Sequence, residues 1–116
     1  SMKKLKLVIN NESKNSSKNS FFIRQEFKTI LDLYAKMVSN GAWRDYSLYL
    51  GQKEISFDVY VRNSEKPVLR IMKKFKPKSY NEKYLLKDGN GKVLLKSEDL
   101  IRLINKTSWN NLKVVK

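Results

Sequence analysis

The residue types that most often perform catalysis or bind transition metals are missing from this chain. It has no histidine and no cysteine, so it lacks the commonest general base at neutral pH, a thiol nucleophile and the usual zinc ligands. Acid–base chemistry would need Asp, Glu, Tyr or Lys side chains with shifted pKa values. Asp45 and Asp58 lie among the predicted strands, but no spacing places them opposite each other. We expect a binding protein rather than an enzyme, with no cofactor and no metal.

One short segment, Asp-Gly-Asn-Gly-Lys at 88–92, partly matches two ligand-binding loops. The calcium loop of an EF-hand requires Asp or Asn at its fifth position and Gly at its sixth, where this chain has Lys92 and Val93. A phosphate-binding P-loop requires Gly at the position of Leu86 and Ser or Thr at the position of Val93. Both interpretations therefore fail. The segment is typical of a hairpin turn between two strands.

The strongest functional signal is the positive charge. The chain carries 25 Lys and Arg against 11 Asp and Glu, a net charge of +14. Residues 62–96 hold eleven basic and three acidic groups, a net +8, and residues 1–20 add five Lys and one Glu, a net +4. Such a field attracts negative charge at long range. The sequence therefore predicts a polyanionic or acidic partner.

The basic stretch 62–96 is the best candidate for the binding surface. On a strand that continues the alternation, Arg62, Arg70 and Lys74 share a side with Tyr60, and further lysines follow in a loop. Basic and aromatic side chains on an open sheet hold phosphates and stack on bases. We therefore predict weak, salt-dependent binding of DNA or RNA, with Tyr60 stacking on a base. The residues predicted to contact phosphates are Arg62, Arg70, Lys73, Lys74, Lys76 and Lys78.

Codon drift, or protection of a strand edge, would also account for part of the positive charge. Lys outnumbers Arg by 20 to 5, which is typical of an AT-rich genome, although codon drift should raise Glu as well. Lysines on a solvated face also protect an edge strand from aggregation. The alternative interactions are an acidic protein on the same surface and a homodimer through a sheet edge, and the sequence leaves the oligomeric state open. Contact with anionic lipid is disfavoured, because no basic amphipathic helix with aromatic anchors is present.

Two helices are predicted, the first over residues 24–39. The Asn40–Gly41 pair suits a left-handed C-terminal cap for this helix. Ser97 is expected to cap the second helix, with acids at 98–99 in the first turn and an apolar face in 100–104. The first helix is predicted because its apolar residues recur every three or four positions. These residues are Phe27, Ile30, Leu31, Tyr34, Met37 and Val38.

Between the helices the apolar period changes to two, which indicates strands. Pro67 is compatible with a strand because the first position need not donate a ladder hydrogen bond. The predicted strands lie at 46–50, 55–61, 67–72, 84–86 and 93–95. The order of elements predicts the α+β class, with a mostly antiparallel meander sheet of about five strands and the two helices packed on one face.

The length predicts one domain, at 21–105. Residues 1–20 are expected to form a basic, flexible tail because 10–20 are polar and low in complexity. The apolar positions of 5–9 either dock as an edge strand or stay loose. A C-terminal tail is predicted at 106–116, with core-docking anchors at Trp109, Leu112 and Val114.

The sequence also predicts a cytoplasmic protein without a membrane span. Lys6 interrupts the only apolar stretch near the N-terminus, so that stretch does not match a secretory signal. No apolar run approaches the roughly 20 residues of a transmembrane helix. The lack of cysteine suits a reducing compartment.

Two stretches carry a resemblance to a known family. Residues 31–38 followed by Gly-Ala-Trp-Arg-Asp-Tyr at 41–46, and Ser-Glu-Lys-Pro-Val-Leu-Arg-Ile at 64–71, are similar to an uncharacterised family of small alphaproteobacterial proteins, domain of unknown function 2794. The similarity covers roughly residues 22–105. Where the family has an aspartate before its first helix, this chain has Ile23. The resemblance implies a bacterial cytoplasmic protein and transfers no functional residue.

Overall fold

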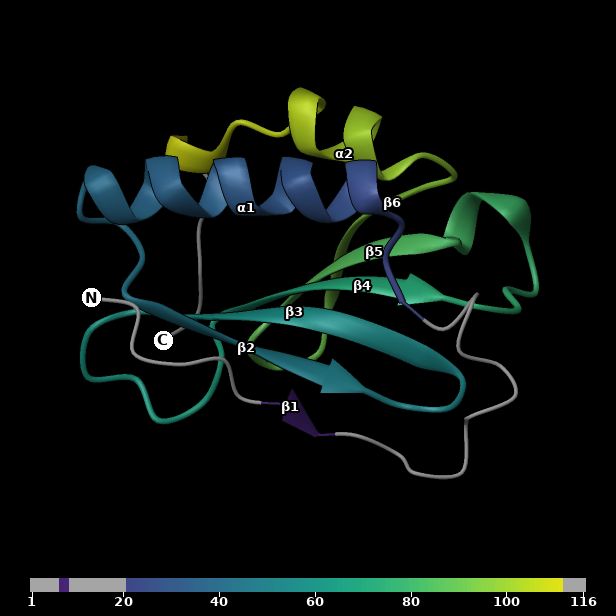
Figure 1. Ribbon diagram of the computed structural model, residues 1–116, viewed down its shortest axis with the longest axis horizontal. Helices are drawn as coiled ribbons and strands as arrows, with labels where there is room; N and C mark the ends of the chain where they lie inside the picture. Colours follow the sequence, from purple (N-terminus) through teal and green to yellow (C-terminus); the bar gives the residue numbers. More distant parts are fainter. Residues whose placement is uncertain (1–6, 9–20, 112–116) are drawn as a thin grey trace.

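A single sheet lies beneath two helices (Figure 1). The computed structural model describes residues 7–8 and 21–111. The strands are β1 (Leu7–Val8), β2 (Asp45–Leu50), β3 (Glu54–Tyr60), β4 (Leu69–Lys74), β5 (Tyr84–Asp88) and β6 (Val93–Ser97). The helices are α1 (Arg24–Ser39) and α2 (Leu100–Lys106), with 3-10 turns η2 (Tyr80–Glu82) and η3 (Trp109–Asn111). This arrangement confirms the predicted α+β class.

The strands follow one another across the sheet in chain order, from β1 to β6. From β2 to β6 every neighbouring pair is antiparallel, which confirms the predicted meander. The short strand β1 pairs in parallel with β2, so that Leu7 lies opposite Leu48. The predicted edge strand thus forms at 7–8, whereas Leu5, Ile9 and the rest of the 1–20 tail lie outside the described residues.

The core forms where α1 crosses the sheet. Ile30, Tyr34 and Met37 on one face of α1 are buried, as the helical spacing predicts. Phe57 of β3 lies fully buried below them, with the Tyr46 ring stacked on it at 4.5 Å and Tyr34 edge-on at 5.8 Å. Burial of a large apolar side chain contributes about 1.5–3 kcal/mol. This aromatic cluster therefore holds α1 against β2 and β3.

The helix ends differ in how well the sequence predicts them. Gly41 has φ +84°, which confirms the left-handed cap after α1. The predicted Ser97 cap of α2 is wrong. Asp99 is the cap residue, and its carboxylate accepts a hydrogen bond from the Arg102 N–H at 3.2 Å. Ser97 still belongs to β6, so the helix begins later and the Ser97 hydroxyl accepts from the Asp99 N–H instead.

The chain beyond α2 returns to the core. The ring N–H of Trp109 donates to the Ile104 carbonyl at 2.9 Å, and its ring packs edge-on against Trp43 at 5.7 Å. The predicted anchor at Trp109 is confirmed, while Leu112 and Val114 lie outside the described residues. No helix in the part of the chain that the structure describes is long and apolar enough to span a membrane.

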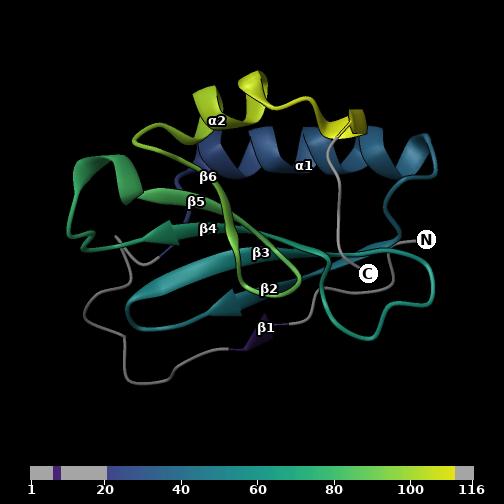
Figure 2. The same cartoon turned by 180° about the vertical axis from the view of Figure 1, so that it is seen from behind.

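The face of the sheet opposite the helices is only partly open. Figure 2 shows the molecule from behind, with β6 rising from its hairpin with β5 to the helix layer. The strand alternation places Tyr60, Arg70 and Lys74 on this face, as predicted. Its centre, however, contains side chains that are less than 5% exposed, namely Ser56, Asp58, Met72 and Leu85. Any ligand on this face would therefore contact its ends rather than its centre.

Candidate binding sites at the two ends of the sheet

Arg70, predicted to contact a phosphate, pairs with a carboxylate of its own chain. Its Nε and Nη2 donate to Oδ1 and Oδ2 of Asp58, each at 3.1 Å. Asp58 is buried and also accepts from the Ser56 hydroxyl at 2.7 Å. The hydrogen bond to Asp58 raises the pKa of Arg70. The guanidinium therefore compensates a buried charge, and little of its field remains for an external anion.

Lys73 also lies inside the protein, on the helix-facing side of β4 with Ile71. Its Nζ donates to Glu26 Oε1 at 3.1 Å and to the Phe21 carbonyl at 3.0 Å. The hydroxyl of Tyr84 donates to the other Glu26 oxygen. The predicted phosphate contact by Lys73 does not fit this geometry, because its ammonium group is buried and already bonded.

We call Glu26, Lys73 and Tyr84 the buried triad. Burial, and then the hydrogen bond to Glu26, raise the pKa of the Tyr84 hydroxyl above its ordinary value. A cavity of about 430 Å³ is lined by Glu26 and Tyr84 of the triad together with Ile23, Tyr80, Lys83 and residues 98–101. Among the described residues no buried side-chain nitrogen or oxygen lacks a hydrogen-bond partner. The triad thus serves to join α1, β4 and β5.

The remaining predicted residues do not form one surface. Arg62 follows β3 at the end of the sheet where β4 begins, whereas Lys74, Lys76 and Lys78 lie where β4 finishes. In Figure 1 the β3–β4 and β4–β5 connections lie at opposite sides of the sheet. A strand of this length spans roughly 20 Å at about 3.3 Å per residue. The sequence therefore predicted one binding site, whereas the fold places its residues at two opposite ends of the sheet.

A cluster of lysines occupies the second of these ends. The Phe75 N–H donates to the Lys53 carbonyl at 3.0 Å, and the Lys74 N–H donates to the Lys83 carbonyl at 2.8 Å. These bonds bring together three segments, including the β2–β3 turn, and the lysines they carry. We call this cluster the lysine end; it comprises Lys53, Lys74, Lys76, Lys78 and Lys83.

The lysine end is poorly compensated by acids. Its five ammonium groups form no ion pair with any carboxylate of the described residues. Glu82, the acid of the adjacent η2, pairs with Lys96 at 3.6 Å. Glu54 lies opposite Lys74 in the strand register but does not reach ion-pair distance. This end of the sheet therefore presents unneutralised positive charge to solvent.

The aromatic residue beside these lysines is Tyr80, which no sequence pattern had singled out. Its side chain is 79% exposed, at the start of η2. Tyr60, the residue predicted to stack, is half-buried, and its hydroxyl lies 3.2 Å from the Ser47 hydroxyl in a hydrogen bond. One feature of the sequence could have identified Tyr80: it is an aromatic residue in the loop after Pro77, outside every alternating apolar pattern.

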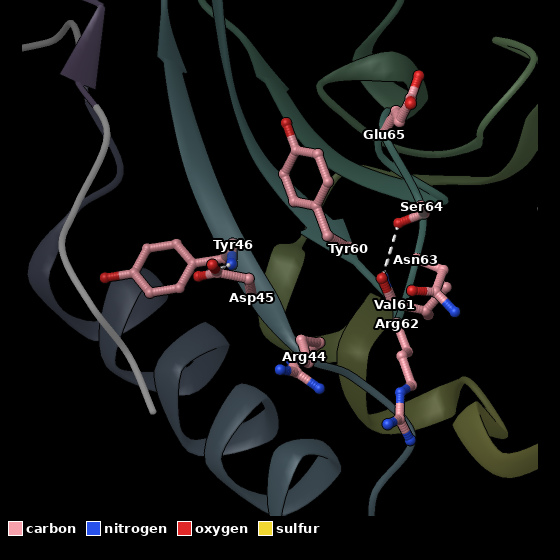
Figure 3. Close-up of a pocket in the computed structure, with 9 residues that line it drawn as sticks. All are labelled: Arg44, Asp45, Tyr46, Tyr60, Val61, Arg62, Asn63, Ser64 and Glu65. Carbon is pink, nitrogen blue, oxygen red and sulfur yellow. Dashed lines mark hydrogen bonds between the residues drawn. The ribbon is translucent and has the colours of Figure 1, made fainter.

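The opposite end of the sheet holds a polar pocket of about 510 Å³, lined by residues 44–46 and 60–65 (Figure 3). It lies where β2 begins and the β3–β4 connection leaves the sheet. Two arginines, Arg44 and Arg62, contribute to its walls. Within the described ranges, no cluster of three or more acidic side chains is placed to hold a metal ion.

These features define the class as a small α+β domain with an antiparallel meander sheet and two helices on one face. Residues 20–104 match the family described as Protein of unknown function (DUF2794). The chain therefore belongs to this family, as the resemblance in its sequence indicated. No match was found among curated proteins or among solved structures.

Proposed function

We propose that this protein is a non-enzymatic module that binds single-stranded DNA or RNA through the lysine end. The observation that supports this proposal is the combination of five uncompensated lysines with an aromatic side chain that is 79% exposed. Lysine ammonium groups attract phosphates as point charges, and an exposed ring offers a face to an unpaired base. The lysine end and Tyr80 would supply the two kinds of contact that a single-strand site uses. The cytoplasm stays the predicted location.

The residues proposed here differ from those predicted by the sequence. Arg70 and Lys73 are left out because each neutralises a buried carboxylate. Arg62 and Tyr60 are left out because they lie at the other end of β3. The residues proposed to contact nucleic acid are Lys53, Lys74, Lys76, Lys78, Lys83 and Tyr80.

Salt dependence and stacking set the expected behaviour. The affinity falls as salt rises, and each phosphate that is neutralised on a single strand makes the negative slope of log K against log salt concentration steeper by about 0.7. Stacking on Tyr80 would contribute about 1–3 kcal/mol per base. Binding should therefore be weak at physiological salt, much tighter at low salt, and insensitive to sequence.

The test is fluorescence anisotropy with a labelled oligothymidine at low and moderate salt. The double variant Lys76→Glu/Lys78→Glu should weaken binding at least tenfold, because two attractive charges become repulsive. A matched control, Lys36→Glu/Lys106→Glu, makes the same charge change on exposed positions of the helices. It should have a smaller effect. The proposal fails if the wild-type protein does not bind at low salt, or if both variants lose affinity equally.

A homodimer through the β6 edge is the second candidate. β6 is the last strand of the sheet, and its Val93 and Leu95 side chains are 43% and 40% exposed. An unpaired edge with apolar side chains is suited to pairing with a second copy. Sedimentation equilibrium of the wild-type protein and of Val93→Lys/Leu95→Lys would test this candidate. A wild-type monomer at high concentration would exclude it.

A further inference from the structure

The pocket at the arginine side of the sheet contains two guanidinium groups that no described residue neutralises. Arg44 precedes β2 and Arg62 follows β3, and neither forms an ion pair with a carboxylate of the described residues. Figure 3 shows both guanidinium groups extending toward the same side of the pocket, while the Glu65 carboxylate points to the opposite side. The pocket therefore has a positive side and a negative side.

The backbone of Arg44 is fixed from two directions. Its N–H donates to the Tyr60 carbonyl at 2.8 Å, at the end of the β2–β3 ladder. Its carbonyl accepts a hydrogen bond from the buried Tyr34 hydroxyl at 3.3 Å. The backbone from which the Arg44 side chain extends is thus held by both the sheet and α1.

Arg62 lies in a tight turn that is fixed by its own hydrogen bonds. The Ser64 hydroxyl accepts from the Val61 N–H at 3.0 Å, and the Ser64 N–H donates to the Val61 carbonyl at 3.2 Å. Asn63 completes the turn with φ 65°, a left-handed conformation that Asn tolerates better than most residues. A site whose backbone is already ordered spends less free energy on binding.

The two arginines reach the same pocket from the ends of neighbouring strands. Asp45 pairs with Tyr60 at the end of the β2–β3 ladder, and Arg44 and Arg62 lie just beyond this pair. Like charges that line one pocket repel each other. A bound anion would remove this repulsion, and guanidinium groups match phosphate with paired, charge-assisted hydrogen bonds. The positive side of the pocket is therefore suited to a phosphate group.

The acids of the pocket restrict the ligand further. One oxygen of Asp45 accepts from the Tyr46 N–H at 2.9 Å, and the other has no partner among the described residues. A carboxylate oxygen repels a bare anion but accepts from a hydroxyl or amino group. We infer that the pocket binds a small phosphorylated compound, with its phosphate on Arg44 and Arg62 and a hydroxyl or amino donor on Asp45. The volume of about 510 Å³ lies within the range of small-molecule sites, about 300–1,000 Å³.

The experiment is an amide NMR titration of the full chain with ribose 5-phosphate, compared with ribose and with inorganic phosphate. We expect ribose 5-phosphate to shift the Arg44 and Asn63 amides and to bind about tenfold more tightly than inorganic phosphate, because only the sugar phosphate also reaches Asp45. Ribose should cause no shift. Equal affinity for ribose 5-phosphate and inorganic phosphate, or no shift at these amides, would overturn the inference.

Variants separate this pocket from the lysine end. Arg44→Gln and Arg62→Gln should each weaken binding about tenfold or more, since each removes charge-assisted hydrogen bonds. Arg102→Gln, which changes an exposed arginine on α2, is the matched control and should bind like the wild type. An unchanged amide spectrum away from each substitution would confirm the fold. Shifts confined to the Lys76 and Lys78 amides would overturn the pocket and leave the nucleic-acid proposal intact.

Discussion

The Nζ atom of Lys73 lies 3.1 Å from Oε1 of Glu26, and both side chains are only 9% exposed. Glu26 is in the first turn of α1 and Lys73 is near the end of β4. Glu26 also accepts from the Ile23 N–H at 2.9 Å, so it caps the helix that it anchors. One carboxylate thus compensates a buried cation, satisfies a free backbone donor of α1 and binds Tyr84.

Removal of one member of this ion pair should strongly destabilise the protein. Lys73→Met leaves the Glu26 carboxylate buried without its cation, and the expected cost is about 3–5 kcal/mol. The double variant Lys73→Met/Glu26→Leu should lose less than the sum of the single variants, because no uncompensated charge remains. Urea unfolding followed by circular dichroism measures all three free energies.

An exposed ion pair of the same helix provides the control. Lys28 and Asp32 pair at 3.0 Å, with side chains that are 74% and 69% exposed. Lys28→Met should leave the free energy of unfolding nearly unchanged, because solvent screens such pairs. If Lys73→Met unfolds at the same urea concentration as Lys28→Met, the buried pair does not stabilise the fold.

Stability should fall at alkaline pH because of Tyr84. Its pKa is raised in the folded state above the ordinary value of 10.0, chiefly by burial and then by Glu26. The folded protein therefore retains a proton that the unfolded chain releases, so stability is fully present below pH 10 and is lost as the pH rises above it. Tyr84→Phe should show a weaker decline, and urea midpoints on both sides of pH 10 measure the difference.

The loss of stability at alkaline pH should not vanish in Tyr84→Phe. Burial, followed by the nearby Asp45 carboxylate, also raises the pKa of Tyr34 and of Tyr46. A decline in Tyr84→Phe that matches the wild type would show that Tyr84 does not carry the effect.

The Arg70–Asp58 pair should affect stability rather than binding. Asp58→Asn removes a buried charge that accepts hydrogen bonds from Arg70 and Ser56, at an expected cost of about 1–3 kcal/mol. Arg70→Gln should cost more, about 3 kcal/mol, because it leaves the Asp58 carboxylate, which is only 4% exposed, without its cation. Oligonucleotide affinity of folded Arg70→Gln should equal that of the wild type. A tenfold loss would restore Arg70 to the binding surface.

The two tyrosines should differ in their effect on nucleic-acid binding. Tyr80→Ala removes the exposed ring at the lysine end and should weaken oligonucleotide binding by about 1–3 kcal/mol without lowering stability. Tyr60→Ala should leave the affinity unchanged, because this side chain lies at the opposite end of β3. Anisotropy titrations of both variants at one salt concentration test the assignment. A larger loss of affinity in Tyr60→Ala than in Tyr80→Ala would favour the face of the sheet opposite the helices as the binding surface.

Local patterns predicted the helices and strands, although α2 is capped by Asp99 instead of Ser97 and β4 begins at Leu69 instead of Pro67. The three- and four-residue spacing predicted α1 over 24–39, and the alternation placed Arg70 and Lys74 on the face away from the helices. The same alternation indicated that Lys73 faces the helices, because it shares its side of β4 with Leu69 and Ile71. Only its charge suggested a solvent position, and the carboxylate that allows its burial lies 47 residues away in the sequence.

The sequence by itself determined the class of the protein, the positive charge, the lack of histidine and cysteine, and the order of its elements. These properties depend on composition and on contacts between residues close along the chain. The tertiary structure decided which charges are free. Pairing across β4 buried Lys73, compensated Arg70 and placed Lys53 and Lys83 on either side of the end of β4. Pairing of β2 with β3 placed Arg44 and Arg62 at one pocket. A charge is neutralised or left exposed by its neighbours in space, and a single sequence does not specify distant neighbours until the strands are in register.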